Sequence, residues 1–435
     1  MTATPASADS DHSTGQSTGK STGPRTDRST GHEADQADQA DRAAAPEQSA
    51  PRRVTTLELF FDLVFVFTIT QLTVLLADDL SFAQVGRVLL IFAVLYWMYG
   101  AYAYLTNQVP PENLSRRVIL MVGMFGFLTC ALAIPKVFGV DGVAFGLAFI
   151  LVTAVHSALY ALIHRKYVLS FAVPNLAAAA CVTAAGAVNG GTAADVLWLA
   201  AVVLQQVAPV VSGRVTGDYG QGRARVTENV GDLDPAHFVE RHGLLLIIAF
   251  GESVVAIGAG AAGTRLDWPL AAGIALALTL AVALWWTYFG HDESAAEHAL
   301  AAASGIQRFR LGMRAYYYSF IPMLLGIAIL AAGLKKAIGH LGDALPTAPA
   351  IALAGGVAVF LVGDLCFRRS LRISPMFFRA VGAAAVLATI PLAGASAAAE
   401  LLGLAVVMVL MLVAEEDARR RQLRGPTSHG ESITH

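Results

Sequence analysis

The sequence predicts an all-α membrane protein, a helical bundle that crosses the bilayer about twelve times. Of its 435 residues, 55% are hydrophobic and only 14% are charged, whereas soluble domains carry about a quarter charged residues. The mean hydropathy is +0.58. From residue 53 onward, apolar runs follow one another, each of roughly 18–23 residues, which is the length a helix needs to cross about 30 Å of hydrocarbon.

Twelve such runs lie in order along the chain. They are 57–76, 85–105, 117–135, 143–163, 168–188, 194–212, 240–261, 268–290, 313–334, 349–367, 376–394 and 397–414. A polar connector, 213–239, separates the sixth from the seventh, and a second polar loop precedes the ninth.

The two ends of the chain differ from this core. Residues 1–52 repeat the triplet STG, continue as DQADQADRA and contain no large apolar residue after Met1. Such a segment cannot bury enough surface to offset its ordering entropy, so it is predicted to be a disordered cytoplasmic tail. Residues 416–435 are predicted to form a second one.

Basic residues gather on alternate connections between the predicted spans. One set of connections carries Arg52, Arg53, Arg116, Arg117, Arg165, Lys166, Arg214, Arg223, Arg225, Arg308, Arg310, Arg314, Arg368, Arg369, Arg372, Arg419, Arg420 and Arg421. The other set carries only Lys136, Arg265, Lys335 and Lys336. Because basic loops stay in the cytoplasm, we expect a multi-pass protein of a bacterial inner membrane with both termini inside.

The pattern also indicates an internal repeat of two six-helix halves, 53–212 and 240–415. Glu58 opens the first half and Glu240 the second, and LYWMYGAY and LWWTYFG follow about 40–45 residues later. AIPKVFG at 133–139 then corresponds to GLKKAIG at 333–339. Halves of six helices insert in the same orientation, which makes a parallel repeat of the kind seen in transporters. The alternative is that aromatic belts and basic flanks recur in any polytopic protein.

Three stretches resemble the bacterial low temperature requirement protein A family. They are ELFFDLVFVFTITQL at 58–72, ERHGLLLIIAFGESVVAIG at 240–258 and RAYYYSFIPMLLGIAILAAGLKKAIGH at 314–340. The resemblance extends over about 53–415. It implies a polytopic membrane protein named for a growth phenotype in the cold, and it brings no set of catalytic residues.

Carboxylates within the first span are the leading site candidates. An acid at membrane depth costs about 2.5–3.5 kcal/mol on insertion scales and therefore suggests function. Glu58 and Asp62 lie one turn apart on one helix face. The alternatives are that Glu58 only caps the positive helix end and that Asp62 is a structural partner of an arginine.

The seventh span adds Glu240, His242, Glu252 and Ser253. Glu252 follows Glu240 by twelve residues, which is about 18 Å of helix and places Glu252 near the bilayer centre. A protonated glutamate bonded to a neighbouring helix is the alternative. Secondary candidates are Gln71, His156, Asn175, Asp364 and Glu400. Of these, His156 is expected to be a satisfied core histidine, Asp364 a local partner of Arg368, and Glu400 an outer-interface residue.

These observations favour a secondary transporter or ion-coupled permease for a small solute, with proton or cation sites at Asp62 and Glu252. The alternative is a non-transporting membrane factor in envelope or cold-stress adaptation. No HExxH, Cys/His spacing or clustered Ser/His/Asp is present, so we expect no enzyme activity, metal or cofactor. The expected partners are the lipid bilayer and a small solute or ion, without nucleic acid, and a homo-oligomer stays open.

Overall fold

The computed structural model describes residues 53–108, 111, 113–163, 168–215 and 233–423, and every regular element in these ranges is helical. The predicted tail at 1–52 and the central part of the predicted connector, 216–232, lie outside them.

The first group of helices runs from residue 56 to residue 215. Its elements are α2 (Thr56–Asp78), α3 (Phe82–Gln108), α4 (Leu114–Ala133), the 3₁₀ turn η1 (Ile134–Lys136), α5 (Gly142–Ile163), α6 (Val168–Val188) and α7 (Gly191–Val215).

The second group runs from residue 235 to residue 423. Its elements are α9 (Pro235–Ala261), α10 (Trp268–Phe289), α11 (Asp292–Ala302), α12 (Gly305–Gly312), the π-helix η2 (Met313–Tyr318), α13 (Phe320–Ala337), the 3₁₀ turn η3 (Ile338–His340), α14 (Thr347–Leu371), α15 (Phe377–Leu387), the 3₁₀ turn η4 (Ile390–Gly394) and α16 (Ala397–Leu423).

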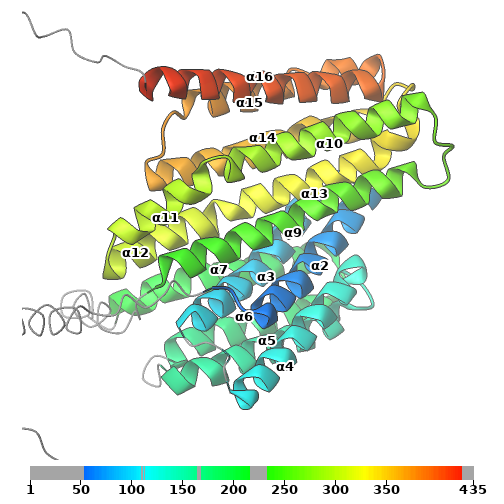
Figure 1. Cartoon of the computed structure of the whole chain (residues 1–435). Helices are drawn as coiled ribbons and strands as arrows, with labels where there is room; N and C mark the ends of the chain where they lie inside the picture. The colour runs from blue at the N-terminus through cyan, green and yellow to red at the C-terminus, as the bar shows by residue number, and fades with distance from the viewer. Residues whose placement is uncertain (1–52, 109–110, 112, 164–167, 216–232, 424–435) are drawn as a thin grey trace, which may run out of the picture. The chain divides into compact units, whose positions relative to one another are not determined.

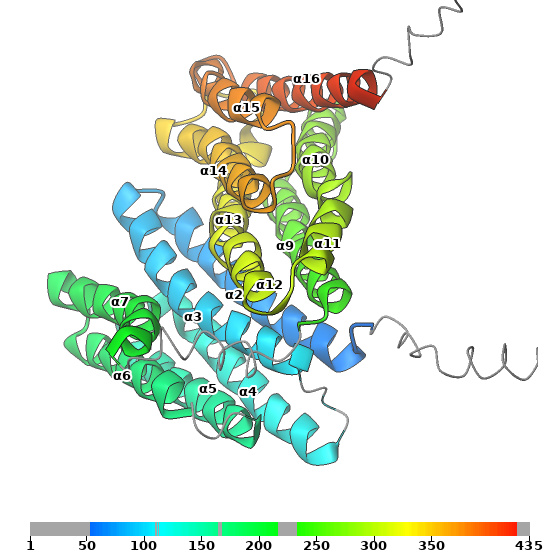
Figure 2. The ribbon, with the colours of Figure 1, turned by 90° about the vertical axis from the view of Figure 1, so that its left-hand side faces the viewer.

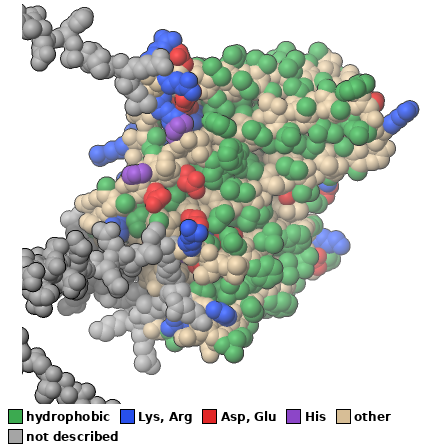
Figure 3. Space-filling model, viewed as in Figure 1, with side chains coloured by type: hydrophobic (Ala, Val, Ile, Leu, Met, Phe, Trp, Pro, Cys, Tyr) green, Lys and Arg blue, Asp and Glu red, His purple; other side chains and the backbone are tan. Residues whose placement is uncertain are grey.

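The all-α membrane bundle is confirmed. Within the described ranges, eleven helical segments are long and apolar enough to cross a membrane, and α7, the sixth predicted span, has a shorter apolar stretch at Gly191–Val207. On the face shown in Figure 3, hydrophobic side chains form a broad band between charged groups at the two ends of the helices. That distribution is what a hydrocarbon layer between two aqueous interfaces requires.

Three predicted polar segments are partly helical. The helix α9 begins at Pro235. The Asp234 side chain accepts hydrogen bonds from the free backbone N–H groups of Ala236 and His237, and Pro235 has no N–H that would need an acceptor. The predicted loop before the ninth span contains α11 and α12, and α16 continues to Leu423 into the predicted tail.

The two groups pack their helices in the same order. In the first, α2 packs on α4, and then α4 on α5, α5 on α6 and α6 on α7, while α7 returns to α3. In the second, α9 packs on α13, and then α13 on α14, α14 on α15 and α15 on α16, while α16 returns to α10. Figures 1 and 2 show both groups. They meet where α2 of the first group packs against α9 and α13 of the second. The α2–α9 contact positions the site described below.

A close helix crossing, between α13 and α14, depends on glycine. A Cβ at Gly326 would lie 2.6 Å from the carbonyl oxygen of Gly356, and one at Gly356 would lie 2.8 Å from the Cα of Leu330. Small residues let membrane helices approach this closely. We therefore expect Gly356→Ala to lower stability by about 1–3 kcal/mol through overpacking.

The adjacent Gly355 provides the control, since a Cβ there would meet only Ile351 of the same helix at 3.9 Å. Thermal unfolding in detergent should show a lower midpoint for Gly356→Ala than for Gly355→Ala. Equal midpoints would mean that the helices do not cross at Gly356.

Candidate functional site

Four ionisable side chains meet in a buried cluster between α2 and α9. They are Glu58, Asp62, His237 and Arg241, which we call the α2–α9 cluster, and each is at most 1% exposed. The Arg241 guanidinium lies 3.0 Å from Asp62 Oδ1 and 3.6 Å from Glu58 Oε1, and His237 Nε2 lies 3.3 Å from Glu58 Oε2. The helix α3 contributes the Tyr99 hydroxyl, which donates to Asp62 Oδ1 at 3.0 Å.

The capping of the two helices explains why these side chains meet. The N-cap residues are Thr55 in α2 and Asp234 in α9. Glu58 and His237 each stand three residues after their cap, and Asp62 and Arg241 each stand seven residues after it. Corresponding positions of two neighbouring helices therefore carry complementary groups, and each acid faces its counterpart.

Hydrogen bonds define the proton on His237. The backbone N–H of Asp234 donates to Asn107 Oδ1 at 3.1 Å, which orients the amide so that Nδ2 faces His237 Nδ1 at 3.0 Å. In this arrangement Nδ1 accepts, so the imidazole is neutral and its Nε2–H donates to Glu58. Glu58 Oε2 also accepts the backbone N–H and the hydroxyl of Thr55, at 2.9 and 2.8 Å.

The charges of the α2–α9 cluster do not balance. Two carboxylates face one guanidinium and one neutral imidazole, which leaves one excess negative charge. Two carboxylate oxygens, Glu58 Oε1 and Asp62 Oδ2, are buried without a hydrogen-bond partner in the described part of the chain. Because an uncompensated buried charge is costly, the cluster has both the place and the electrostatic need for one additional proton or cation.

Glu252 lies farther along the same interface. Its Oε2 accepts the hydroxyl proton of Thr70 in α2 at 2.7 Å, and its side chain is 6% exposed. The neighbouring Ser253 hydroxyl is buried without a hydrogen-bond partner among the described residues. Since α9 begins before Glu240, Glu252 stands about 26 Å along a helix of about 40 Å, and about 16 Å beyond Arg241.

The other two α9 candidates lie away from the cluster. Glu240 is exposed and accepts the backbone N–H of Val54 at 3.3 Å. His242 is buried against Phe238, Tyr316 and Phe320 on another side of α9. Of the six candidates, the structure thus brings Glu58 and Asp62 together and separates them from Glu240, His242, Glu252 and Ser253.

His237, Asn107 and Tyr99 are members of the site that the sequence reasoning missed. Aligning the halves on Glu58 and Glu240 shifts the second helix by three residues. Asp234 is a residue type that favours the N-cap position, and it is followed by proline. Aligning Asp234 with the N-cap residue Thr55 would have placed His237 opposite Glu58.

A second buried cluster joins α11, α14, α15 and α16, and we call it the α14–α16 cluster. Its members are Asp292, Asp364, Arg368, Arg379 and Glu415. Arg368 lies 2.6 Å from both Asp292 and Glu415. Asp364 lies 3.8 Å from Arg368, as predicted, but 3.2 Å from Arg379, so its interaction extends beyond its own helix.

Four of the five secondary candidates, Asp364, Asn175, His156 and Glu400, are buried as well, whereas Gln71 is half-buried. Asn175 Oδ1 accepts an N–H of Gln205 at 3.2 Å. Glu400 is fully buried in the first turn of α16, and neither of its carboxyl oxygens has a hydrogen-bond partner among the described residues. His156 is buried, as expected for a core histidine, and the Ala101 backbone is its hydrogen-bonding neighbour.

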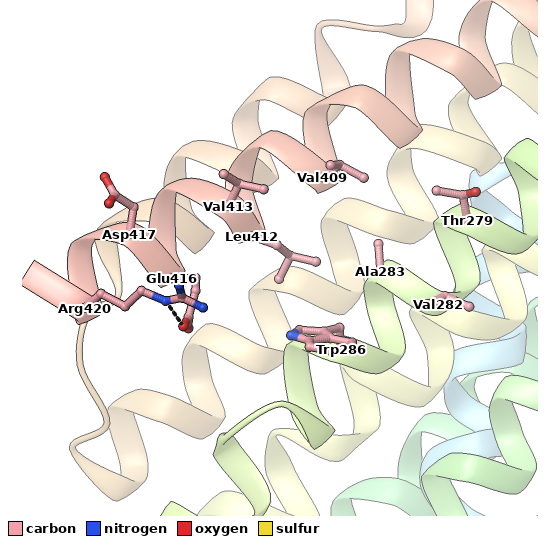
Figure 4. A pocket seen from close by; sticks show the side chains of 10 residues that line it. All are labelled: Thr279, Val282, Ala283, Trp286, Val409, Leu412, Val413, Glu416, Asp417 and Arg420. Atoms are coloured by element: carbon pink, nitrogen blue, oxygen red, sulfur yellow. Dashed lines mark hydrogen bonds and ion pairs between the residues drawn. The ribbon is translucent and has the colours of Figure 1, made fainter.

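An apolar groove of about 530 Å³ lies between α10 and α16 (Figure 4). Its walls include Val282, Trp286 and Val413, and its charged side chains come from the last turns of α16. There Glu416 lies 2.7 Å from Arg420 on the same helix. The groove-lining charges are thus at the end of a helix, remote from the α2–α9 cluster in sequence.

Comparisons with known proteins found a family model and a relative that match this chain. The family model described as bacterial low temperature requirement A protein matches residues 53–414. A protein of Rhizobium meliloti (strain 1021), named uncharacterized protein RA0937, is 27% identical over 325 residues, which cover 73% of this chain and 78% of that protein. No solved structure matches the chain.

Proposed function

The chain belongs to the bacterial low temperature requirement A family, and from that premise we propose that it is a proton-coupled secondary transporter for a small solute. The observation that carries the proposal is the α2–α9 cluster, in which two buried carboxylates face one guanidinium and two carboxylate oxygens have no hydrogen bond to the described residues. Ionisable groups inside a membrane bundle commonly form proton relays or ion sites.

The packing order supports a parallel repeat as the framework of this transporter. Its halves are the predicted 53–212 and 240–415, and their helices correspond as α2 to α9, α4 to α13 and α7 to α16. Each third membrane helix ends in a 3₁₀ turn, η1 after α4 and η3 after α13. Transporters of this type place their ion and substrate sites between the repeats, where α2 meets α9.

In the proposed mechanism, one proton neutralises the excess charge on Glu58 and Asp62. With that proton bound, Asp62 attracts Arg241 less strongly, and the two halves separate more easily at this end of the α2–α9 interface. Loss of the proton restores the ion pair and closes that end. Glu252, bonded to Thr70 across the same two helices, provides a second protonation site deeper in the bundle. The basic loops support an inner-membrane protein with both termini in the cytoplasm, which puts the α2–α9 cluster at the cytoplasmic end.

The test is transport in proteoliposomes that contain a pH-sensitive dye and face a panel of small solutes. We expect solute-dependent proton movement for the natural protein. Asp62→Asn should reduce it at least tenfold, because the variant removes the excess charge, and Glu252→Gln should reduce it as well. Glu240→Gln, on the exposed side of the same helix, is the matched control and should transport normally.

The outcomes separate the alternatives. Unchanged proton movement in both Asp62→Asn and Glu252→Gln would refute these sites. Transport that follows a sodium gradient at constant pH would assign the excess charge to a metal cation instead of a proton. A natural protein that moves no solute of the panel would favour the non-transporting membrane factor.

A further inference from the structure

A cavity of about 260 Å³ lies where α3, α5, α6, α9, α12 and η2 converge. Aromatic rings form most of its wall, including those of Tyr96, Trp97, Tyr104 and Tyr316. The π-helix η2 supplies Tyr316 and Tyr317 to the lining. Single π-helical turns are rare and are frequent at functional sites.

The size of the cavity indicates the size of its ligand. An engineered apolar cavity of about 150 Å³ binds one benzene molecule. A cavity of 260 Å³ therefore fits a planar molecule of about two fused rings. Rings of this kind gain offset or edge-to-face contacts with aromatic walls, each worth about 0.5–1.5 kcal/mol beyond area burial.

Two histidines give the cavity a polar component. The Nδ1–H of His242 donates to the Phe238 carbonyl at 2.8 Å, which makes Nε2 the acceptor nitrogen of the ring. His156 is 2% exposed and has the Ala101 backbone as its hydrogen-bonding neighbour, so its ring adds a second polar group to the wall. Both imidazoles line the cavity, so a ligand with an N–H or O–H group could donate to the Nε2 acceptor of His242.

The lining also constrains the charge of the ligand. No Asp, Glu, Lys or Arg is among the described residues that line the cavity. An ion would lose its hydration there without gaining a counter-charge, and the aromatic faces would return only about 2 kcal/mol to a cation, less than the cost of burying an ion. The chemistry therefore favours a neutral molecule.

We propose that this cavity is a binding site for a neutral, planar aromatic molecule of about two rings that donates a hydrogen bond to His242 Nε2. The site is independent of the proposed proton coupling, because its ligand binds whether or not the α2–α9 interface transports protons.

Indole is a suitable probe because it has two fused rings and one N–H donor. Equilibrium dialysis of the purified full-length protein in detergent, against protein-free micelles, should show saturable binding of one indole per chain. Benzofuran, which has nearly the same shape but no N–H, should bind about fivefold more weakly, as expected for one lost hydrogen bond. Benzyltrimethylammonium tests the charge of the ligand and should not compete.

Two glycines of α3 provide a matched pair of variants. Gly100 lines the cavity, and a Cβ there would meet Tyr317 at 3.6 Å, whereas a Cβ at Gly86 would meet nothing within 4 Å. Gly100→Leu should fill the cavity and weaken indole binding at least tenfold, while Gly86→Leu should bind normally. Should Gly100→Leu fail to fold, Gly100→Ala adds a single methyl at ordinary contact distance and should still weaken binding measurably.

His242→Phe preserves a ring and removes the acceptor. We expect it to lower indole affinity to that of benzofuran and to leave benzofuran binding unchanged. Absent or non-saturable indole binding by the natural protein would overturn the proposal, as would unchanged indole binding by Gly100→Leu. Equal affinities for indole and benzofuran would overturn the role of His242, and competition by benzyltrimethylammonium would overturn the neutral ligand class.

Discussion

Replacing Arg241 with methionine is expected to destabilise the protein by about 3–5 kcal/mol, the usual cost of removing one partner from a buried ion pair. The variant would leave Asp62 and Glu58 buried without the guanidinium that now lies 3.0 and 3.6 Å away. The hydroxyl of Thr106, which Arg241 contacts, would lose that contact too. Unfolding in detergent, followed by loss of helical signal, measures the effect.

The matched control is Arg310→Met, since Arg310 is exposed and exposed charges contribute about 0–1 kcal/mol. A triple variant, Glu58→Gln with Asp62→Asn and Arg241→Met, removes the whole set of formal charges and should recover much of the stability lost by Arg241→Met alone. If Arg241→Met proved as stable as Arg310→Met, Arg241 would not be the buried partner of these carboxylates.

Arg379→Met is the second change with a large expected effect, again about 3–5 kcal/mol. Arg379 connects three elements: its guanidinium lies 2.5 Å from Glu415 in α16 and 3.2 Å from Asp364 in α14, and it donates to the Thr287 carbonyl in α10 at 3.2 Å. Losing it would leave two buried acids with Arg368 as their remaining cation. Thermal unfolding should show a strongly lowered midpoint.

Arg369, which follows Arg368 in the sequence, is exposed. Arg369→Met is therefore the matched control for Arg379→Met and should unfold near the midpoint of the natural protein. The α14–α16 cluster also carries one more carboxylate than guanidinium, and Asp364 Oδ1 has no hydrogen-bond partner within the described residues. Asp364→Asn should therefore cost much less than Arg379→Met. The reverse order would contradict the excess negative charge of this cluster.

Much of the architecture could be predicted from the sequence because the bilayer imposes simple constraints. A helix must contain about 20 apolar residues to cross it, and those runs can be counted directly. The cost of an ionised group at membrane depth likewise singled out Glu58, Asp62 and Glu252, all of which are buried in the structure. The amphipathic helices α11 and α12 were not found, since they are too short and polar to resemble spans.

The sequence by itself thus determined the all-α membrane class, the approximate positions of eleven of the twelve predicted spans and the presence of costly buried acids. Only the tertiary structure decided which groups meet: Asp62 pairs with Arg241, 179 residues away, while the adjacent His242 lines the aromatic cavity. Consecutive helical residues point about 100° apart, so one can face α2 and the next another neighbour. In a soluble helix an apolar stripe would identify the inward face. A membrane helix is apolar toward lipid and protein alike, and only packing chooses its orientation.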